Sequence, residues 1–378
     1  MNAMKKLYQE WRALQPLKSE LQRQMDQQFM IDFNYNSNHL EGNTLTYGQT
    51  KLLLLFGDTI GNASMQDYEE MKAHNVGLEL MKLAAIDKTR ALTETFIREL
   101  NKTILVRDFY KTSRDGEYRY KIHVGVYKTR PNSVITPTGE VFDYASPEET
   151  SALMSDLVGW YNEEERKEIL SPVELSALFH YRYIRIHPFE DGNGRIARLL
   201  VNYILLRHNY PMIVIRTDDR VNYLKMLHQC DLLTGKIPSD GATATFEQTR
   251  PLIDYITDIT ENKLIAVLQL AKGKITEIIE SKNDDVPEKT LDSQQKTNNG
   301  QNNVPDNVPD NVPEIDAQKR QKLIINFIKM NNKISSTEIA GLLKVNSKTV
   351  KRDFQQLKNR EIIKRIGSDR GGHWEIIK

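Results

Sequence analysis

The segment from Ser281 to Asp316 divides the chain into two parts that must fold separately. Asn, Asp, Gln, Lys and Pro make up most of it, and large apolar residues are almost absent. Within it, the run Val304–Asn307 (Val-Pro-Asp-Asn) repeats as Val308–Asn311 and begins again at Val312. Such a segment cannot bury enough apolar surface to offset its conformational entropy. We therefore expect a linker, held partly extended by its prolines.

The two parts carry opposite charge although the whole chain is nearly neutral. The net charge of all 378 residues is +1, whereas residues 318–378 hold 15 basic and 5 acidic side chains, a net charge of +10. The rest of the chain therefore has a net charge of −9. A basic C-terminal part on an acidic body predicts different partners for the two parts.

Cysteine content and apolar runs indicate the compartment. Cys230 is the single cysteine, which excludes an internal disulfide and suits a reducing environment. Residues Met1 to Gln15 contain no apolar signal core. The apolar run Leu52 to Phe56 is far shorter than the roughly 18 residues of a membrane span. We expect a cytoplasmic protein with no membrane contact.

The part before the linker predicts a mainly α fold that contains one β-ribbon. Ser146-Pro147 and Ser171-Pro172 each place a capping serine before a proline at the first helical position, with an acid in the first turn. Alternating apolar residues, with Gly139-Glu140 at a turn, predict a β-hairpin within 117–143. Further helices are expected over 4–31, 66–86, 93–105, 171–186, 193–208, 219–233 and 246–280, the last breaking near Lys272-Gly273.

One short stretch gathers the groups needed to bind phosphate. Residues His187 to Arg198 read His-Pro-Phe-Glu-Asp-Gly-Asn-Gly-Arg-Ile-Ala-Arg. Gly192 and Gly194 free the backbone to point successive N–H groups into one site, and the start of a helix adds partial positive charge. Arg195 and Arg198 lie three positions apart on one face of that helix, so both can reach the same anion.

A metal ion and a base belong to the same prediction. The carboxylate of Asp191 would be repelled by a phosphate at this turn unless a divalent cation lay between them. Mg²⁺ commonly binds through one or two carboxylates and phosphate oxygens. A histidine side chain ordinarily titrates close to neutrality, so His187 is the candidate general base.

Other interpretations of the same residues stay open at this point. An isolated histidine is often structural, and Asp-Gly-Asn-Gly is often only a turn. Residues 192–197 also fit the loose dinucleotide pattern G-x-G-x-x-A. The helix start at Ser171 and the lack of a βαβ run favour the phosphate site over the dinucleotide site.

His187 to Arg198 resembles, at every defined position, the signature of the Fic family, and the resemblance extends over about residues 30–260. It implies an all-helical core whose motif loop lies between two helices. The implied activity is transfer of AMP from ATP to a hydroxyl of a target protein. The implied roles are a base at His187, Mg²⁺ binding at Asp191, a phosphate cradle at Gly192, Asn193 and Gly194, and contacts to the β- and γ-phosphates from Arg195 and Arg198.

Ser37 and Glu41 form a second pattern far upstream. They lie four positions apart, hence on one helical face, and Gly42 follows as an expected helix stop. A solvated helix end explains this pattern by itself. The run Ser-x-x-x-Glu-Gly also resembles the inhibitory motif of Fic proteins that carry it before the core. That resemblance implies that Glu41 pairs with Arg198 and competes with the γ-phosphate, and in some relatives the same glutamate supports removal of AMP.

The expected β-hairpin resembles the Fic flap, which pairs with a segment of the target protein. Lys128, Thr129 and Ile135 mark the edge expected to take part, and a purely structural hairpin remains the alternative. Tyr223 lies in a segment that the resemblance places near the adenine and ribose of ATP.

The C-terminal part resembles a winged helix-turn-helix. Helices are expected over 322–330, 336–343 and 347–359, followed by strands over 362–366 and 373–377. Nucleic-acid phosphates and a docking protein are both open as its partner. The residues expected to contact DNA are Lys348, Lys351, Arg352 and, in the wing, Arg370.

Together these features predict a mainly α, Fic-type helical core with a β-hairpin flap and a small α+β winged-helix domain. The expected segments are an N-terminal helical region over 1–110, the core over 111–280, the linker over 281–317 and the winged domain over 318–378. The expected enzyme uses ATP and Mg²⁺ on a target protein or on itself, and it is held off by Glu41. A DNA-binding regulator with a nucleotide-sensing core, an AMP-removing enzyme, transfer of another phosphate-containing group, and a homo-oligomer remain open.

Overall fold

The structure is a computed structural model of the chain. It describes residues 3–283 apart from 60, 62, 114–115 and 136–140, and then 334–343, 345–367, 372–377 and a few positions between 320 and 332. The chain forms two compact units, Met1–Asp58 with Ala63–Pro287, and Thr59–Asn62 with Glu288–Lys378. The boundary expected after residue 110 lies inside the first unit, and most of the expected linker lies outside the described residues.

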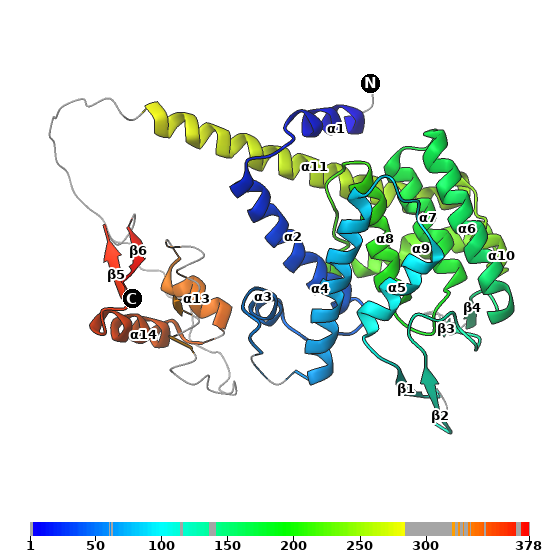
Figure 1. The fold of residues 1–378 in the computed structure, drawn as a ribbon, viewed down its shortest axis with the longest axis horizontal. Coiled ribbons are helices and arrows are strands. Elements are labelled where there is room, and N and C mark those ends of the chain that lie inside the picture. The colour runs from blue at the N-terminus through cyan, green and yellow to red at the C-terminus, as the bar shows by residue number, and fades with distance from the viewer. Residues whose placement is uncertain are drawn as a thin grey trace. The chain divides into compact units, whose positions relative to one another are not determined.

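The first unit consists mainly of α-helices (Figure 1), as the sequence predicts. Ser171 Oγ accepts a hydrogen bond from the backbone N–H of Glu174, whose carboxylate accepts one from Ser171 N–H, so the predicted cap is present. The helices are α1 Ala3–Ala13, α2 Ser19–His39, α3 Tyr47–Phe56, α4 Met65–Ile86, α5 Glu94–Leu105, α6 Pro147–Lys167, α7 Pro172–Ile186, α8 Asn193–Arg207, α9 Arg220–Thr234, α10 Pro238–Ala242 and α11 Phe246–Asn283, with a 3₁₀ turn at Thr217–Asp219.

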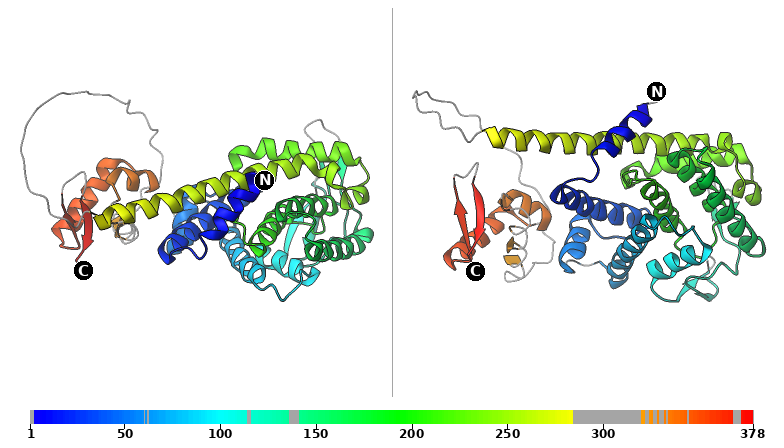
Figure 2. Two further views of the ribbon diagram at one scale, coloured as in Figure 1. Left: turned by 90° about the horizontal axis from the view of Figure 1, so that it is seen from above. Right: turned by 45° about the horizontal axis from the view of Figure 1, so that its top comes forward.

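Two expected helix boundaries are wrong. The helix expected over 4–31 is two helices, α1 and α2, because Pro16 between them supplies no N–H and clashes with a preceding helical turn. Helix α11 instead continues through Lys272-Gly273 without a break. A single glycine costs a helix only about 1 kcal/mol, which a long helix can absorb. Figure 2 shows α11 as the longest rod of this unit, with α1 against it, where Met4 and Trp11 pack into the α11 core cluster.

The expected single ribbon is two separate antiparallel hairpins. Strand β1 (Phe109–Thr112) pairs with β2 (Arg119–Ile122), and β3 (Ser133–Ile135) pairs with β4 (Val141–Asp143). The alternation beyond Ile122 does not continue as a strand, because the chain turns at Gly125 with φ +70°. That turn is fixed by Asn101, whose side-chain oxygen accepts the Gly125 N–H at 2.8 Å.

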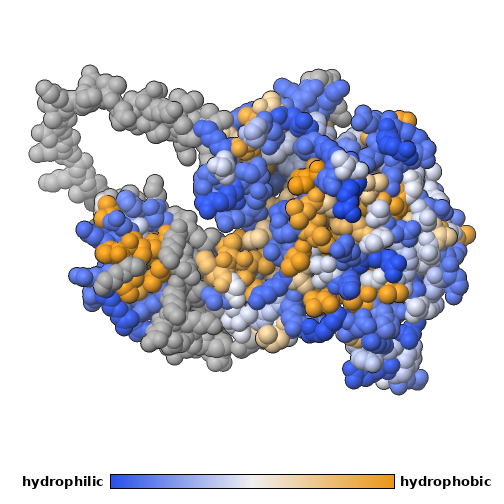
Figure 3. Space-filling view, viewed as in Figure 1, coloured by the Kyte–Doolittle hydropathy of each residue, from blue (hydrophilic) through white to orange (hydrophobic). Residues whose placement is uncertain are grey.

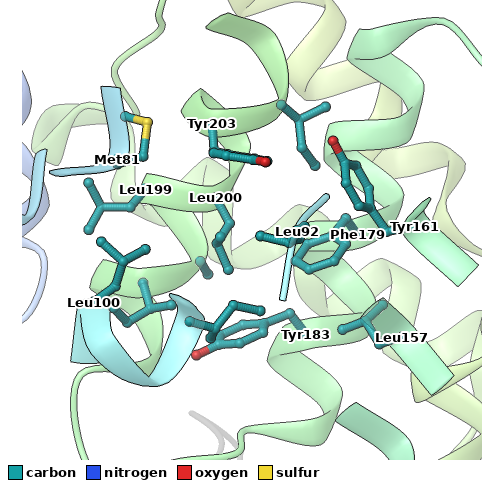
Figure 4. Packing of buried hydrophobic residues seen from close by; sticks show 14 of the residues in the cluster. Met81, Leu92, Leu100, Leu157, Tyr161, Phe179, Tyr183, Leu199, Leu200 and Tyr203 are labelled. Atoms are coloured by element: carbon teal, nitrogen blue, oxygen red, sulfur yellow. The ribbon is translucent and has the colours of Figure 1, made fainter. Parts of the chain in front are cut away.

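Helix α8 lies at the centre of the first unit and contacts α2, α4, α5 and α7. It is buried on nearly all sides, as expected for a helix that packs against several neighbours. Figure 4 shows the core between α4, α5, α6, α7 and α8, whose labelled members include Met81, Leu100, Tyr161, Tyr183 and Leu199. The polar residues of α8 are therefore held in place by packed neighbours. The face of this unit seen in Figure 3 is largely hydrophilic with smaller apolar patches.

The second unit contains α13 (Ser336–Leu343), α14 (Ser347–Asn359) and a hairpin of β5 (Ile363–Ile366) and β6 (His373–Ile376). This is the predicted order of a winged helix. The rings of Phe354 and Trp374 stack with centroids 4.4 Å apart, joining α14 to the hairpin. The first expected helix, over 322–330, and the wing at 368–371 lie largely or wholly outside the described residues.

Candidate functional site

The loop from His187 to Gly192 joins the end of α7 to the start of α8. His187 caps α7 in the left-handed region, with φ 51°, and its N–H donates to the Tyr183 carbonyl at 2.9 Å. Gly192 precedes α8 with φ 82°, a conformation that favours glycine. These two left-handed residues turn the chain sharply between two buried helices, so the loop has little freedom.

The loop is also pinned by side chains on both sides. The Asn193 amide accepts from Phe189 N–H at 3.0 Å and donates to the Phe189 carbonyl at 2.6 Å. Asn132 Nδ2 donates to the carbonyl of Phe189 at 3.1 Å, and Asn101 Nδ2 donates to that of Asp191 at 2.9 Å. The side chain of Asn193 therefore holds the loop, and only its backbone N–H remains for the predicted phosphate cradle.

The His187 ring stacks on the Tyr144 ring, with centroids 3.9 Å apart and an angle of 11° between planes. Burial, and then the nearby Lys128 ammonium, lower the pKa of His187 to about 4. The imidazole is therefore neutral at pH 7, as a general base must be. A hydrogen bond of the ring with the Ile184 backbone raises this pKa, but by less than burial lowers it.

The first turn of α8 is arranged to hold an anion, and a carboxylate lies there. Backbone N–H groups in the first turn of a helix have no partner within the helix. A Cβ at Gly194 would overlap Glu41 Oε1, so the Glu41 carboxylate rests directly against this turn. A side chain at position 194 would prevent that approach. The start of α8 thus accepts an anionic group against its backbone.

Arg198 donates hydrogen bonds to both residues of the upstream pattern, Ser37 and Glu41. Its Nε–H donates to Ser37 Oγ at 3.0 Å, and its Nη2 donates to the Ser37 carbonyl at 2.7 Å and to Glu41 Oε1 at 2.8 Å. Ser37 lies in the last turn of α2, and Glu41 follows that helix in a turn that ends at Gly42 with φ 97°. Burial raises the pKa of Glu41, but Arg198 outweighs this and lowers it, so the carboxylate is ionised.

Asp191 lies between two cations. Its Oδ1 accepts from Arg195 Nη2 at 3.1 Å, and its Oδ2 forms an ion pair with Lys111 of β1. Burial raises the pKa of Asp191, but Lys111 and Arg195 together lower it. Arg195 also approaches Glu70 of α4 at 3.7 Å. A charged carboxylate is thus held at the edge of the anion site.

Asp191 fits a divalent metal only if a nucleotide supplies further ligands. Within the described residues, no group of three or more His, Cys, Asp or Glu side chains could hold an ion. One carboxylate is a common protein contribution to a Mg²⁺ site that phosphate oxygens and water complete. The donor set therefore suits Mg²⁺ bound together with a polyphosphate.

Two of the residues expected at the flap, Lys128 and Thr129, contact the motif loop. Lys128 is 3% exposed; its N–H donates to the Pro188 carbonyl, and its Nζ donates to the Ile186 carbonyl at 2.9 Å. The N–H of Thr129 donates to Glu190 Oε1 at 3.2 Å. These two N–H groups are therefore already used within the chain. Ile135 pairs with Val141 across β3 and β4, but its side chain is outside the described residues.

Among the remaining expected residues, Tyr223 lies close to Arg198. Burial raises the pKa of Tyr223 to about 12, although the charge and a hydrogen bond of the arginine lower it. Tyr223 is buried on α9, and its hydroxyl lies 2.8 Å from His180 Nε2. Lys348, Lys351 and Arg352 are exposed along α14, whereas Arg370 lies outside the described residues.

Four residues of the site carry no signal in the sequence. Lys111 belongs to a short strand that alternation did not predict, and Tyr144 follows β4. Asn101 and Asn132 act on the loop through single amide contacts from distant segments. Each acts only because the fold brings it to the loop, so no local pattern could have found it.

Comparison with known proteins agrees with this geometry. The model of the Fic/DOC family matches residues 91–205, and that of the DeoR-like helix-turn-helix domain matches residues 320–372. The chain is 29% identical over 234 residues to protein adenylyltransferase Fic of Nematostella vectensis, covering 62% of this chain and 48% of that protein. It is 27% identical to protein adenylyltransferase fic-1 of Caenorhabditis elegans, covering 69% and 45%. The chain spans about half the length of the curated relatives it matches.

A solved structure gives a stronger match. A Fic domain containing signaling protein from Bacteroides thetaiotaomicron VPI-5482 is 61% identical, with a TM-score of 0.68, covering 72% of this chain and 97% of that one. Fic-1 from C. elegans, at 24% identity and a TM-score of 0.56, shares the fold. The motif, the helical fold around it and these matches together show that the chain belongs to the Fic/DOC family and carries a DeoR-like helix-turn-helix domain at its C-terminal end.

Proposed function

We propose that this protein is a protein adenylyltransferase that transfers AMP from ATP to a Ser, Thr or Tyr hydroxyl of a target protein. The observation that carries the proposal is the Glu41 carboxylate against Gly194, which marks the start of α8 as an anion site beside a neutral histidine. Relatives named protein adenylyltransferases support the same reaction.

The reaction divides among the residues of the loop and α8. His187 accepts the proton of the target hydroxyl, whose oxygen attacks the α-phosphorus of ATP. The new bond joins that oxygen to AMP, the bond to the β-phosphate breaks, and pyrophosphate leaves. Arg195, Arg198 and the first-turn N–H groups of α8 bind the phosphate oxygens. Mg²⁺, held by Asp191 and the nucleotide, would supply positive charge against the leaving pyrophosphate.

The proposal includes inhibition of this site by its own chain. The Glu41 carboxylate lies where a phosphate would meet the start of α8, and it accepts a hydrogen bond from Arg198. A carboxylate in that position repels the terminal phosphate and engages the arginine that would bind it. ATP that avoids this repulsion would not present its α-phosphorus in line with the hydroxyl. We infer that AMP transfer requires Glu41 and Arg198 to separate.

The position of the label on ATP tests which phosphate is transferred. The full chain with Glu41→Gly is incubated with cell lysate and either α-labelled or γ-labelled ATP. Relative to the lysate alone, we expect added label in protein from α-labelled ATP, no added label from γ-labelled ATP, and none in either case after a further His187→Ala substitution. Transfer of γ-label above that of the lysate alone would make the protein a kinase, and equal α-labelling with His187→Ala would remove the assigned base.

A second function belongs to the C-terminal unit. Lys348, Lys351 and Arg352 form an exposed basic face on α14, in a domain that matches a DeoR-like helix-turn-helix. We propose that this face binds DNA phosphates. Binding of the full chain to duplex DNA should weaken steeply with salt and be lost when all three are replaced by serine. Equal binding by that variant would favour a role of this unit in docking a protein.

A further inference from the structure

Both oxygens of the Asp191 carboxylate are held by cations. Oδ1 accepts from Arg195 at 3.1 Å, and Oδ2 pairs with the Lys111 ammonium. A carboxylate binds Mg²⁺ through these same oxygens. Each oxygen keeps a second lone pair, but a Mg²⁺ ion bound there would lie beside a positive charge, so the metal and the nearer cation compete for the carboxylate.

The two cations differ in their freedom to leave. The Arg195 side chain is 6% exposed and belongs to α8, whose neighbours enclose it. The Lys111 side chain is 41% exposed and belongs to β1 of the β1–β2 hairpin. A lysine has a flexible stem and a strongly hydrated head group, so it exchanges readily between a partner and water. Lys111 is therefore the cation that can leave the Asp191 carboxylate more easily.

We propose that the Lys111 ammonium takes the place of the divalent cation at Asp191 and competes with it. Lys111 thereby sets the Mg²⁺ concentration at which the site binds metal and nucleotide. The inference rests on the proposed function, because the nucleotide supplies the other ligands of the metal. In the resting protein each part of the ligand then has a substitute from the chain: the Glu41 carboxylate replaces a phosphate, and the Lys111 ammonium replaces the metal.

A physical reason favours such a substitute. Asp191 is an ionised carboxylate in a largely buried loop, and an unpaired charge there is costly. Lys111 balances that charge when no metal is bound and is displaced when Mg²⁺ arrives with ATP. Removing Lys111 should thus leave Asp191 short of a cation and strengthen metal binding.

The test measures binding and not catalysis. In the full chain with Glu41→Gly, a fluorescent ATP analogue at micromolar concentration is titrated with Mg²⁺. The readout is the Mg²⁺ concentration that gives half of the maximal analogue binding. We expect Lys111→Met to lower that concentration about two- to fivefold, as loss of a competing, partly exposed ion pair implies. Lys111→Gln is measured in parallel, so that poor folding of one variant does not decide the result.

Two variants serve as controls. Lys121→Met removes the same charge from the facing strand, where Lys121 pairs with Asp108 at 3.1 Å, and should leave the midpoint unchanged. Lys111→Arg keeps the positive charge and should keep the metal requirement of the parent chain. Melting temperatures of all variants check that the hairpin and loop remain folded.

Three results would overturn the proposal. An unchanged midpoint in both Lys111→Met and Lys111→Gln would make the ion pair a mere surface contact. A higher midpoint would mean that Lys111 binds the nucleotide or the metal complex directly. If the parent shows no Mg²⁺-dependent binding, Asp191 is not a metal ligand and the proposal falls with it. Mg²⁺-dependent binding without AMP transfer would instead contradict only the proposed reaction.

Discussion

Glu41 and Arg198 share a hydrogen bond of 2.8 Å although 157 residues separate them in the sequence. The contact joins the turn after α2 to the first turns of α8, and the same carboxylate touches Gly194. One residue thereby contacts both the start of α8, the proposed phosphate position, and the arginine beside it. If the protein transfers AMP, this contact decides how often the site is open.

Ser37 should contribute to the same restraint, but less than Glu41 does. Ser37→Ala removes the acceptor of the Arg198 Nε–H and leaves the carbonyl of residue 37 in place. The loss of one such hydrogen bond, about 1 kcal/mol, should raise AMP incorporation by about fivefold at most. Thr46→Ala is the control, because it removes a hydroxyl that caps α3 and has no contact with Arg198. A fall in AMP incorporation with Ser37→Ala would contradict a purely restraining role.

Tyr144 should orient His187 through ring stacking. Tyr144→Leu removes the stacked ring, whereas Tyr144→Phe keeps it. An aromatic pair contributes about 0.5–1.5 kcal/mol, so the leucine variant should lose about two- to tenfold in kcat, with little change in KM for ATP. The phenylalanine variant should keep nearly full kcat. Equal losses in the two variants would assign the effect to the hydroxyl group.

The rate of AMP transfer should depend little on pH near neutrality. The pKa of His187 is lowered to about 4, so the imidazole remains neutral and able to accept a proton at every pH above about 5. In the Glu41→Gly chain, protonation of His187 should therefore cause no fall in the rate of AMP transfer between pH 8 and pH 6. The unfolded state binds a proton on this residue at higher pH than the folded state does. The stability that His187 contributes is therefore lost as the pH falls from about 6.5 toward 4. An acid limb centred near pH 6.5 would contradict this burial of the ring.

Lys128 should stabilise the motif loop through hydrogen bonds to the residues that flank it. Its Nζ donates to Asn132 Oδ1 at 2.8 Å and to the Ile186 carbonyl at 2.9 Å, and it is 3% exposed. Lys128→Met keeps the length of the side chain but leaves both acceptors without this donor. We expect a loss of about 1–3 kcal/mol in the free energy of unfolding, measured by denaturant titration. The exposed Lys121→Met should change it by less than about 0.5 kcal/mol, and equal effects would remove the special role of Lys128.

Local signals explain what the sequence could predict. The cap at Ser171 and the left-handed turn at Gly192 depend on residues that are neighbours in the chain, so the helices around the loop could be placed in advance. Proline at position 16 also carried a signal for a break between α1 and α2, which the apolar spacing obscured.

Tertiary contacts explain what the sequence could not predict. The turn at Gly125 depends on Asn101 of α5, and the pairing of Asp191 depends on Lys111 of β1. The stacking of Tyr144 on His187 likewise joins the segment after β4 to the end of α7. None of these contacts follows a helical or strand period, so only the folded chain brings the partners together.

The most direct measurement compares AMP incorporation from α-labelled ATP by the natural chain and by Glu41→Gly, at equal protein concentration and with matched melting temperatures. Removing the carboxylate frees Arg198 from a charge-assisted hydrogen bond worth about 1.5–3 kcal/mol, so the rate should rise by about tenfold or more. The same substitution with His187→Ala should show no incorporation. Equal rates in the natural chain and in Glu41→Gly would contradict the claim that this carboxylate holds the site closed.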